Sequence, residues 1–264
     1  MGDLVRCLIC GYKCCQRCPK CGAAYPLKHT EEFHFYSQLY REQYLVIKYI
    51  QRVRIYETII NKILQLGKTK TLNSNIKFLD VGASVGVSLI LFEQYGKAMG
   101  VELNIPELRQ WHRFLGIEHA LIYINEDDNI EEFYETLSDK VNGIDFIFLM
   151  DVLRFIPLPT LIDELVKCLK ENGALVIKEV NPDNRKVMEA RISGKHGDAI
   201  LYSPKTIMYL ARKNKLDVNW YLIASSIDNL AIPLRYSLLR ILKPSAYVAV
   251  LRRKVQHDCC HSST

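Results

Sequence analysis

The sequence predicts an α/β protein built on a doubly wound, mostly parallel sheet, with a small cysteine-rich module in front of it. Short β-rich segments alternate with helical segments from residue 76 onward, and a glycine-rich turn follows the first of these strands. Six of the nine cysteines fall between Cys7 and Cys21. Because such alternation places helices on both faces of a parallel sheet, we expect one large domain with an appendage.

The composition is that of an ordinary folded protein. The 264 residues are 49% hydrophobic and 24% charged, which excludes disordered, collagen-like and coiled-coil classes. A net charge of +6 permits an anionic partner such as RNA without requiring one. No run of 18 apolar residues occurs, so we expect no membrane-spanning helix. Clustered cysteines without a secretion signal predict a cytoplasmic protein rather than a secreted disulfide protein.

The chain divides into four predicted parts. Residues 1–28 are rich in Cys, Gly and Pro, lack hydrophobic periodicity and need a metal to hold them together. Residues 29–72 form a helical connector, because apolar side chains recur three and four apart before a polar linker that starts at Gly67. Residues 73–254 form the sheet domain, and residues 255–264 form a flexible tail.

Strands and helices alternate in order along the sheet domain. The expected strands, which are rich in β-branched and aromatic residues, are 76–81, 98–101, 121–124, 144–150, 174–180, 218–224 and 246–252. The expected helices, in which apolar residues recur at helical spacing, are 87–95, 105–115, 130–137, 159–169 and 204–213.

The most informative segment is the first strand and the small-residue turn that it enters. Gly82 lets the chain turn tightly and approach a ligand, and Gly86 brings the following helix close to the strand. Twenty residues after Gly82, Glu102 ends the next predicted strand, where an acidic side chain can accept hydrogen bonds from both hydroxyls of a ribose. The two features together predict a cofactor that contains a nucleoside.

Glycine spacing distinguishes between such cofactors. A dinucleotide fingerprint places glycine at its first, third and sixth positions, but Gly82, Ser84 and Val87 stand there. The pattern Asp-Val-Gly-x-x-x-Gly, from Asp80 to Gly86, instead resembles motif I of the class I S-adenosylmethionine (SAM)-dependent methyltransferases. Ser84 stands in place of the middle glycine of that family. The resemblance implies a Rossmann-like, seven-stranded sheet and SAM as the cofactor.

Later segments resemble the same family in the expected order. Asp151 follows the fourth strand, where the strand order of such a sheet reverses, and 172–177 resembles the fifth strand with its entry turn. The cofactor-binding residues that the resemblance implies are Asp80, Gly82, Ala83, Ser84, Gly86, Glu102, Leu103, Asn125, Glu126, Asp151 and Val152. Taken alone, Glu102 is also typical of a solvated strand end and Asp151 of a helix cap.

The cysteine cluster contains two copies of Cys-x-x-Cys-Gly. Each copy can form a tight turn in which two thiolates converge, so that Cys7, Cys10, Cys18 and Cys21 surround Zn²⁺ in a zinc-ribbon-like module. Because all four ligands are protein thiolates, this zinc is expected to be structural. In a rival hypothesis Cys14, Cys18 and Cys21 resemble the iron–sulfur ligands of radical SAM enzymes, which leaves the first pair without a role.

The module is also basic. It carries Arg6, Lys13, Arg17, Lys20 and Lys28, and its net charge is +4. Such a surface suits phosphate contacts with RNA, and the same module could instead be a lid over the acceptor pocket. The expected partner is a small-molecule acceptor, with RNA as the alternative and no membrane. The sequence does not indicate an oligomeric state.

Methyl transfer needs an acceptor atom held in line with the methyl group and, usually, a base that removes a proton. The candidate bases follow predicted strands: Glu179 ends the fifth strand, and His196 lies in a predicted polar loop over 181–200. The apolar segment 225–244 is expected to line the acceptor pocket. The segment after the fourth strand contains neither the Asn-Pro-Pro turn of exocyclic-amine methyltransferases nor the Pro-Cys nucleophile of the cytosine-C5 class.

Three functions fit the sequence. The first is a methyltransferase that acts on an oxygen, carbon or nitrogen atom of a small-molecule or glycan-precursor acceptor. The second is an RNA methyltransferase that uses the basic zinc module to bind RNA, with salt-sensitive affinity. The third is a non-enzymatic interaction module that contains zinc and does not bind SAM.

Overall fold

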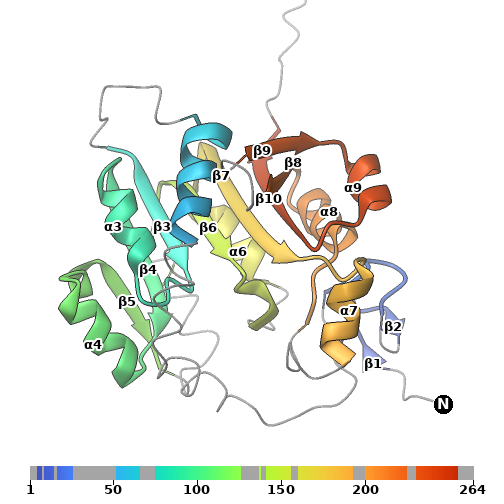
Figure 1. Ribbon diagram of the computed structural model, residues 1–264, viewed down its shortest axis with the longest axis horizontal. Coiled ribbons are helices and arrows are strands. Elements are labelled where there is room, and N and C mark those ends of the chain that lie inside the picture. The colour runs from blue at the N-terminus through green and yellow to red at the C-terminus, as the bar shows by residue number, and fades with distance from the viewer. Residues whose placement is uncertain are drawn as a thin grey trace, which may run out of the picture.

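The computed structural model describes residues 5–7, 9–14, 17–25, 52–65, 75–125, 137, 141–155, 160–192, 200–224 and 230–254. At its centre lies an eight-stranded sheet with the order β5-β4-β3-β6-β7-β10-β8-β9 (Figure 1). Its strands are β3 (Lys77–Val81), β4 (Lys97–Leu103), β5 (Leu121–Ile124), β6 (Ile144–Met150), β7 (Leu169–Val180), β8 (Leu216–Ala224), β9 (Leu230–Leu234) and β10 (Ala246–Arg253). The predicted doubly wound α/β class is confirmed, with one strand more than the seven expected.

The five strands from β5 to β7 are parallel. β10 is antiparallel to both β7 and β8, and β9 lies at the edge, antiparallel to β8. The chain first builds β3, β4 and β5 outward in one direction, and then places β6 on the other side of β3. The strand order therefore reverses between β3 and β6, which is where open α/β sheets bind their ligands.

Helices bury the sheet on both faces, which explains why its central strands are continuous apolar runs. On one face, Phe78 and Phe148 of β3 and β6 pack with Phe92 of α3 (Val87–Glu93) and with Tyr56. Tyr56 belongs to a helix that is described from residue 52 and continues as the π-helical η1, Ile59–Ile63 (the blue helix in Figure 1). This part of the predicted connector thus covers the sheet.

The opposite face is covered by α6 (Leu161–Cys168) and α8 (Pro204–Lys213). Leu165 and Ile207, one from each helix, are fully buried in the same core as Leu149 of β6. The remaining helices are α4 (Pro106–Phe114), η3 (Glu118–Ala120), η4 (Leu153–Phe155), α7 (Arg185–Ile192) and α9 (Tyr236–Leu242). No described helix is both long and apolar enough to cross a membrane.

Two segments differ from the sequence-based expectation. The predicted polar loop over 181–200 contains α7, which begins after a capping Asn184. The segment 225–244, in which no strand or helix was predicted, contains the edge strand β9 and the helix α9. Pro233 obscured β9 in the sequence, and the structure tolerates it because one side of an edge strand needs no hydrogen-bond partner.

The N-terminal module begins with β1 (Val5–Arg6), which pairs antiparallel with β2 (Lys13–Cys14). A bridge then joins Arg17 to Ala24, and Ala24 also pairs with Leu201 of the sheet domain. The module therefore lies against the large domain, beside α7 (Figure 1). The first part of the connector, the tail and most of the predicted helix at 130–137 lie outside the described residues.

Candidate functional site

The turn after β3 has the backbone that its glycines allow. Gly82 and Gly86 have φ values of +77° and +81°, in the left-handed region that favours glycine. The amide of Gly82 donates to the carbonyl of Val101 at 2.8 Å, which ties the turn to β4. A Cβ added at Gly82 would come within 3.0 Å of Val152, and one added at Gly86 within 3.0 Å of Ile117. Backbone conformation and close packing therefore both require glycine.

Ser84 is the residue that replaces a glycine of the family pattern, and it also lies in the left-handed region, with φ +56°. His112 of α4 holds it there, because its Nε2 lies 2.6 Å from the Ser84 carbonyl while its Nδ1 lies 2.9 Å from the Tyr123 hydroxyl. Burial lowers the pKa of His112, although the bond to Ser84 opposes that shift. Nothing in the sequence indicated this contact of His112, since only the tertiary fold brings α4 to the turn.

Glu102, the predicted ribose ligand, is buried at the end of β4 and points toward the same turn. Its carboxylate accepts hydrogen bonds from the amides of Ser84, at 2.5 Å, and Leu103, at 2.8 Å. Burial raises its pKa, and these two amides oppose the shift. Each carboxylate oxygen can accept a further hydrogen bond, so a ribose remains compatible with the arrangement.

Asp80 is fully buried just before the turn. Its Oδ2 accepts hydrogen bonds from the hydroxyl of Tyr56, at 2.9 Å, and from that of Ser88, whereas its Oδ1 has no hydrogen-bond partner among the described residues. Burial raises its pKa to about 7. A recess beside it is lined by Arg52, Val53, Tyr56, Gly82, Ala83, Val87 and Ser88. A half-partnered acid beside a recess fits a ligand that carries a cationic hydrogen-bond donor, such as the ammonium group of SAM.

Asp151 follows β6 at the point of reversal and is surrounded by cations. Lys178 Nζ lies 2.5 Å from its carboxylate, Arg154 lies 3.7 Å away, and Arg52 lies 3.9 Å away. Burial alone would raise the pKa of Asp151, but these three cations lower it overall. Asp151 is therefore ionised and already paired, and its neighbour Val152 is the residue that closes over Gly82.

The other predicted positions lie farther along the sheet edge or outside the described residues. Asn125 follows β5, and its Oδ1 accepts a hydrogen bond from Asn104 Nδ2 at 2.6 Å. Glu126 and His196 belong to segments that the structure does not describe, so neither is placed.

Glu179, the other predicted base, is fully buried near the end of β7. Neither of its carboxylate oxygens accepts a hydrogen bond within the described part of the chain, and burial raises its pKa to about 7 although Arg154 opposes the shift. Tyr247 of β10 lies directly opposite Glu179 in the antiparallel register. Asn181 lies two residues further along the same face, and its Nδ2 likewise lacks a described partner. The strand end thus presents three buried polar atoms without hydrogen bonds.

The four predicted metal ligands are brought together. The Sγ atoms of Cys7, Cys10, Cys18 and Cys21 all lie within 4.8 Å of one another, close to the separation of about 3.8 Å that tetrahedral Zn²⁺ imposes on thiolates. In each pair the following glycine has positive φ and donates its amide to the first cysteine at 2.8 Å. This grouping includes the first pair of cysteines, which the iron–sulfur hypothesis left out.

Comparisons with known proteins bear on the fold. No protein-family model matches the sequence, and neither does any curated protein. The chain is similar to the structure of a SAM-dependent methyltransferase from Thermotoga maritima, described as a possible histamine N-methyltransferase. The TM-score is 0.51 and the identity 16%, over 79% of this chain and 96% of that one.

Two further structures of methyltransferases have lower TM-scores against this chain. A SAM-dependent methyltransferase from Archaeoglobus fulgidus has a TM-score of 0.48 and 12% identity, over 84% of this chain and 100% of that one. The magnesium protoporphyrin IX methyltransferase from Synechocystis PCC 6803, with bound S-adenosylhomocysteine, has a TM-score of 0.47 and 14% identity, over 77% of this chain and 85% of that one. At these identities the likeness concerns the fold alone. The chain therefore has the Rossmann-like α/β fold of the SAM-dependent methyltransferases, with a four-cysteine cluster at its N-terminus.

Proposed function

We propose that this protein is a SAM-dependent methyltransferase that acts on an oxygen, carbon or nitrogen atom of a small-molecule or glycan-precursor acceptor. The observation that carries the proposal is the turn over 82–86, which Glu102 and His112 hold at the point where the strand order reverses. Asp80 lies beside it with one unpartnered oxygen. In a sheet of this fold, such a turn suits a cofactor that has a ribose at one end and a cation at the other.

The chain's own residues divide the work of holding the cofactor. Asp80 would accept a hydrogen bond from its ammonium group, and Glu102 would accept hydrogen bonds from the ribose hydroxyls. The residues Leu103, Asn125 and Glu126 would border the adenine, while Asp151 and Val152 would close the pocket from β6. SAM supplies an electrophilic methyl group on a sulfonium.

Glu179 and His196 are the proposed bases for the acceptor. Glu179 is supported by its burial, its unpartnered oxygens and a pKa raised by burial to about 7, which suits a group that accepts a proton near neutral pH. His196 rests on its residue type alone. Both are expected to act on the acceptor and not on binding of the cofactor.

Zn²⁺ is the metal proposed for Cys7, Cys10, Cys18 and Cys21. Four thiolates that converge from two Cys-x-x-Cys-Gly turns fit its tetrahedral, sulfur-rich coordination, and they leave no position open for a substrate. The metal would therefore hold the module together and take no part in methyl transfer.

Calorimetry on the full, metal-loaded chain tests the proposed activity. We expect SAM and S-adenosylhomocysteine (SAH) to bind, and Asp80→Asn or Glu102→Gln to weaken SAM binding by about tenfold or more, since each removes a charged hydrogen bond. Glu93→Gln, at an exposed acid at the end of α3, is the control and should bind normally. A folded chain that binds neither compound would contradict the proposal and favour a non-enzymatic module.

RNA remains the second candidate for the acceptor, because Arg6, Lys13 and Lys20 are exposed on the module. Arg17 is set aside here, since it forms an ion pair with Asp183 of the sheet domain. The RNA hypothesis expects an affinity that falls steeply with salt and is largely lost when the three exposed residues become glutamine. If this triple variant bound a mixed RNA pool as tightly as the wild type does, the RNA hypothesis would be rejected.

A further inference from the structure

We propose that the second cysteine turn, residues 18–22, is an internal brace through which metal binding fixes the part of the sheet that carries Glu179. The brace consists of contacts between this turn, the N-terminus of α8 and the end of β7. Only the role of Glu179 as a base rests on the proposed function. The coupling between the second cysteine turn and the end of β7 is inferred from their contacts.

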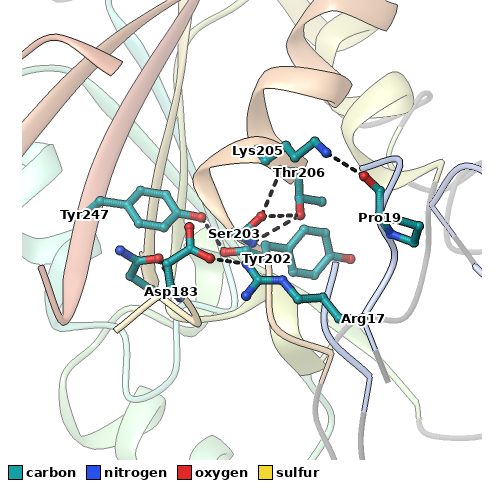
Figure 2. A network of polar contacts seen from close by, with 9 residues as sticks. Arg17, Pro19, Asp183, Tyr202, Ser203, Lys205, Thr206 and Tyr247 are labelled. Atoms are coloured by element: carbon teal, nitrogen blue, oxygen red, sulfur yellow. Dashed lines mark hydrogen bonds and ion pairs between the residues drawn. The ribbon is translucent and has the colours of Figure 1, made fainter. Parts of the chain in front are cut away.

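Three polar connections between described residues join the module to the sheet domain, and Figure 2 shows two of them. Ala24 and Leu201 exchange two backbone hydrogen bonds, of 3.0 Å and 2.9 Å. Lys205, in the first turn of α8, donates its ammonium to the carbonyl of Pro19 at 2.5 Å. Arg17 forms an ion pair with Asp183, which follows β7 (Figure 2). Residues close to the second pair of cysteines make all three connections.

Packing distinguishes the two cysteine turns. A Cβ added at Gly22 would lie 2.5 Å from Ser203 Oγ and 3.0 Å from Lys205 Cβ, so this turn is in tight contact with the start of α8. A Cβ added at Gly11, the equivalent residue of the first turn, would meet nothing within 4 Å. The second turn therefore docks on the sheet domain, and the first has room around its glycine.

One route leads from the docked turn to Glu179. Ser203 caps α8 and exchanges hydrogen bonds with Thr206 in a capping box, and both side chains are fully buried. The carbonyl of the preceding residue, Tyr202, accepts a hydrogen bond from the hydroxyl of Tyr247 at 2.7 Å (Figure 2). Tyr247 lies opposite Glu179 across β10 and β7, so its ring lies on the same face of the sheet as that carboxyl group.

A second route leads along the chain after β7. Asp183, the partner of Arg17, donates its amide to Oδ1 of Asn181 at 3.0 Å. Asn181 in turn donates its amide to the carbonyl of Ser245, just before β10, at 2.8 Å. Both routes converge on the strand end where Glu179 and Asn181 present unpartnered polar atoms.

Metal is needed for the brace because the module has little regular structure of its own. Its strands are two residues long, and three of its four clustered cysteines are buried in the same core as Tyr202 and Tyr247. Without metal, converging thiols lose the bonds that organise such a small segment. We therefore expect metal removal to loosen the docked turn and then the N-terminus of α8 and the end of β7.

Hydrogen–deuterium exchange on the full chain, with metal and after chelation, tests this coupling. We expect amides in peptides over 200–206 and 178–184 to exchange about tenfold faster or more after chelation, because their partners lie on or next to the brace. Peptides over 77–81 and 97–103, in the strands that flank the cofactor turn, should stay unchanged. Faster exchange confined to residues 5–25 would overturn the proposal.

Two glycine variants separate docking from backbone strain. Gly11 and Gly22 have similar positive φ values, +70° and +82°, so alanine strains both turns alike, and only Gly22→Ala adds a clash with α8. Both variants should keep bound zinc, measured by mass spectrometry, while only Gly22→Ala should speed exchange over 200–206. Equal exchange in the two metal-loaded variants would contradict the proposal.

Lys205→Met provides a variant that leaves the module's sequence intact, in case Gly22→Ala loses metal or fails to fold. It removes the ammonium group that contacts Pro19 and keeps the rest of the unbranched, apolar side chain. We expect faster exchange over 200–206 with full zinc content, and unchanged exchange would overturn the proposal. Because no arm of the experiment uses SAM, a failure of the brace and a failure of the proposed activity give different results.

Discussion

Tyr56 donates its hydroxyl to Oδ2 of Asp80 at 2.9 Å, so a helix that precedes the sheet domain in sequence contacts the acid at the start of the cofactor turn. Both residues are buried, and Tyr56 also packs against Phe92 and Phe148. The helix is thereby both a cover for the sheet and a wall of the candidate cofactor site, whose recess it lines with Arg52, Val53 and Tyr56.

Replacing Tyr56 with phenylalanine is expected to destabilise the protein by about 1–2 kcal/mol, since a buried carboxyl group loses one of its two hydrogen bonds. Urea unfolding measures the change. Tyr95→Phe is the matched control, because its hydroxyl makes a longer, exposed hydrogen bond of 3.3 Å to Asn61 and should contribute less than about 0.5 kcal/mol. If both variants lost the same free energy of unfolding, the hydrogen bond to Asp80 would contribute no more than the exposed one.

The contribution of Asp80 to the stability of the protein should fall as pH rises from about 4 through 7. The pKa of Asp80 is raised by burial to about 7 in the folded protein, against about 4 in an unfolded chain. Between these values the folded state binds more protons, so the contribution of Asp80 to stability is complete below about pH 4 and is lost as pH passes 7.

Asp80→Asn stays neutral, so it should reduce the loss of stability between pH 5 and pH 8 by on the order of 2 kcal/mol. Urea unfolding at four pH values over that range would detect the difference. Glu179, whose pKa burial also raises to about 7, should contribute in the same direction, so Asp80→Asn combined with Glu179→Gln should flatten the profile further. Parallel profiles for the wild type and the double variant would contradict the pKa directions.

Gly82→Ala is expected to abolish or weaken SAH binding by at least about tenfold, because the new methyl group meets Val152 and strains the turn. Gly116→Ala has a similar positive φ, +71°, but nothing lies within 4 Å of its added carbon, so it should leave SAH binding unchanged at a cost of only about 1 kcal/mol of stability. Adding Val152→Ala to Gly82→Ala should restore part of the binding by removing the clash. Calorimetry with SAH measures all three.

One zinc ion per chain is expected in protein purified without chelator. Cys10→Ser should lose most of the metal, since three thiolates hold Zn²⁺ far more weakly than four. Cys168→Ser is the control, because Cys168 is a buried cysteine of α6 outside the cluster and should leave the zinc content unchanged. Full zinc content in Cys10→Ser would argue against the four-cysteine site.

The elements that the sequence identified are those whose signals are local. Apolar runs located β5, β6 and α8 to the residue, because strand and helix periodicities are written in adjacent side chains. Local signals failed at α7, where a polar helix has no strong apolar stripe, and at β9, where Pro233 hides an edge strand. The fold class followed from the order of elements, since parallel strands joined by helices have few alternative arrangements.

The candidate site was predicted by residue type but not by contact. Spacing identified the glycine turn, Glu102 and the two cysteine pairs, because a turn and a pair of metal ligands each involve only a few neighbouring residues. The resemblance to motif I added Asp80. Which partner each one meets depends on residues far away in the chain. Tyr56 reaches Asp80, His112 holds Ser84, and the second cysteine turn docks on α8.

The sequence by itself therefore determined the sheet, the turn and the metal-binding pattern. Only the tertiary structure decided that Glu102 also accepts hydrogen bonds from the turn and that three cations surround the ionised Asp151. It likewise decided that one basic residue of the module, Arg17, pairs with Asp183 of the sheet domain. The physical reason is that burial and pairing of polar groups depend on contacts across many residues. No local periodicity records such contacts, whereas backbone conformation and ligand spacing are set within a few neighbouring residues.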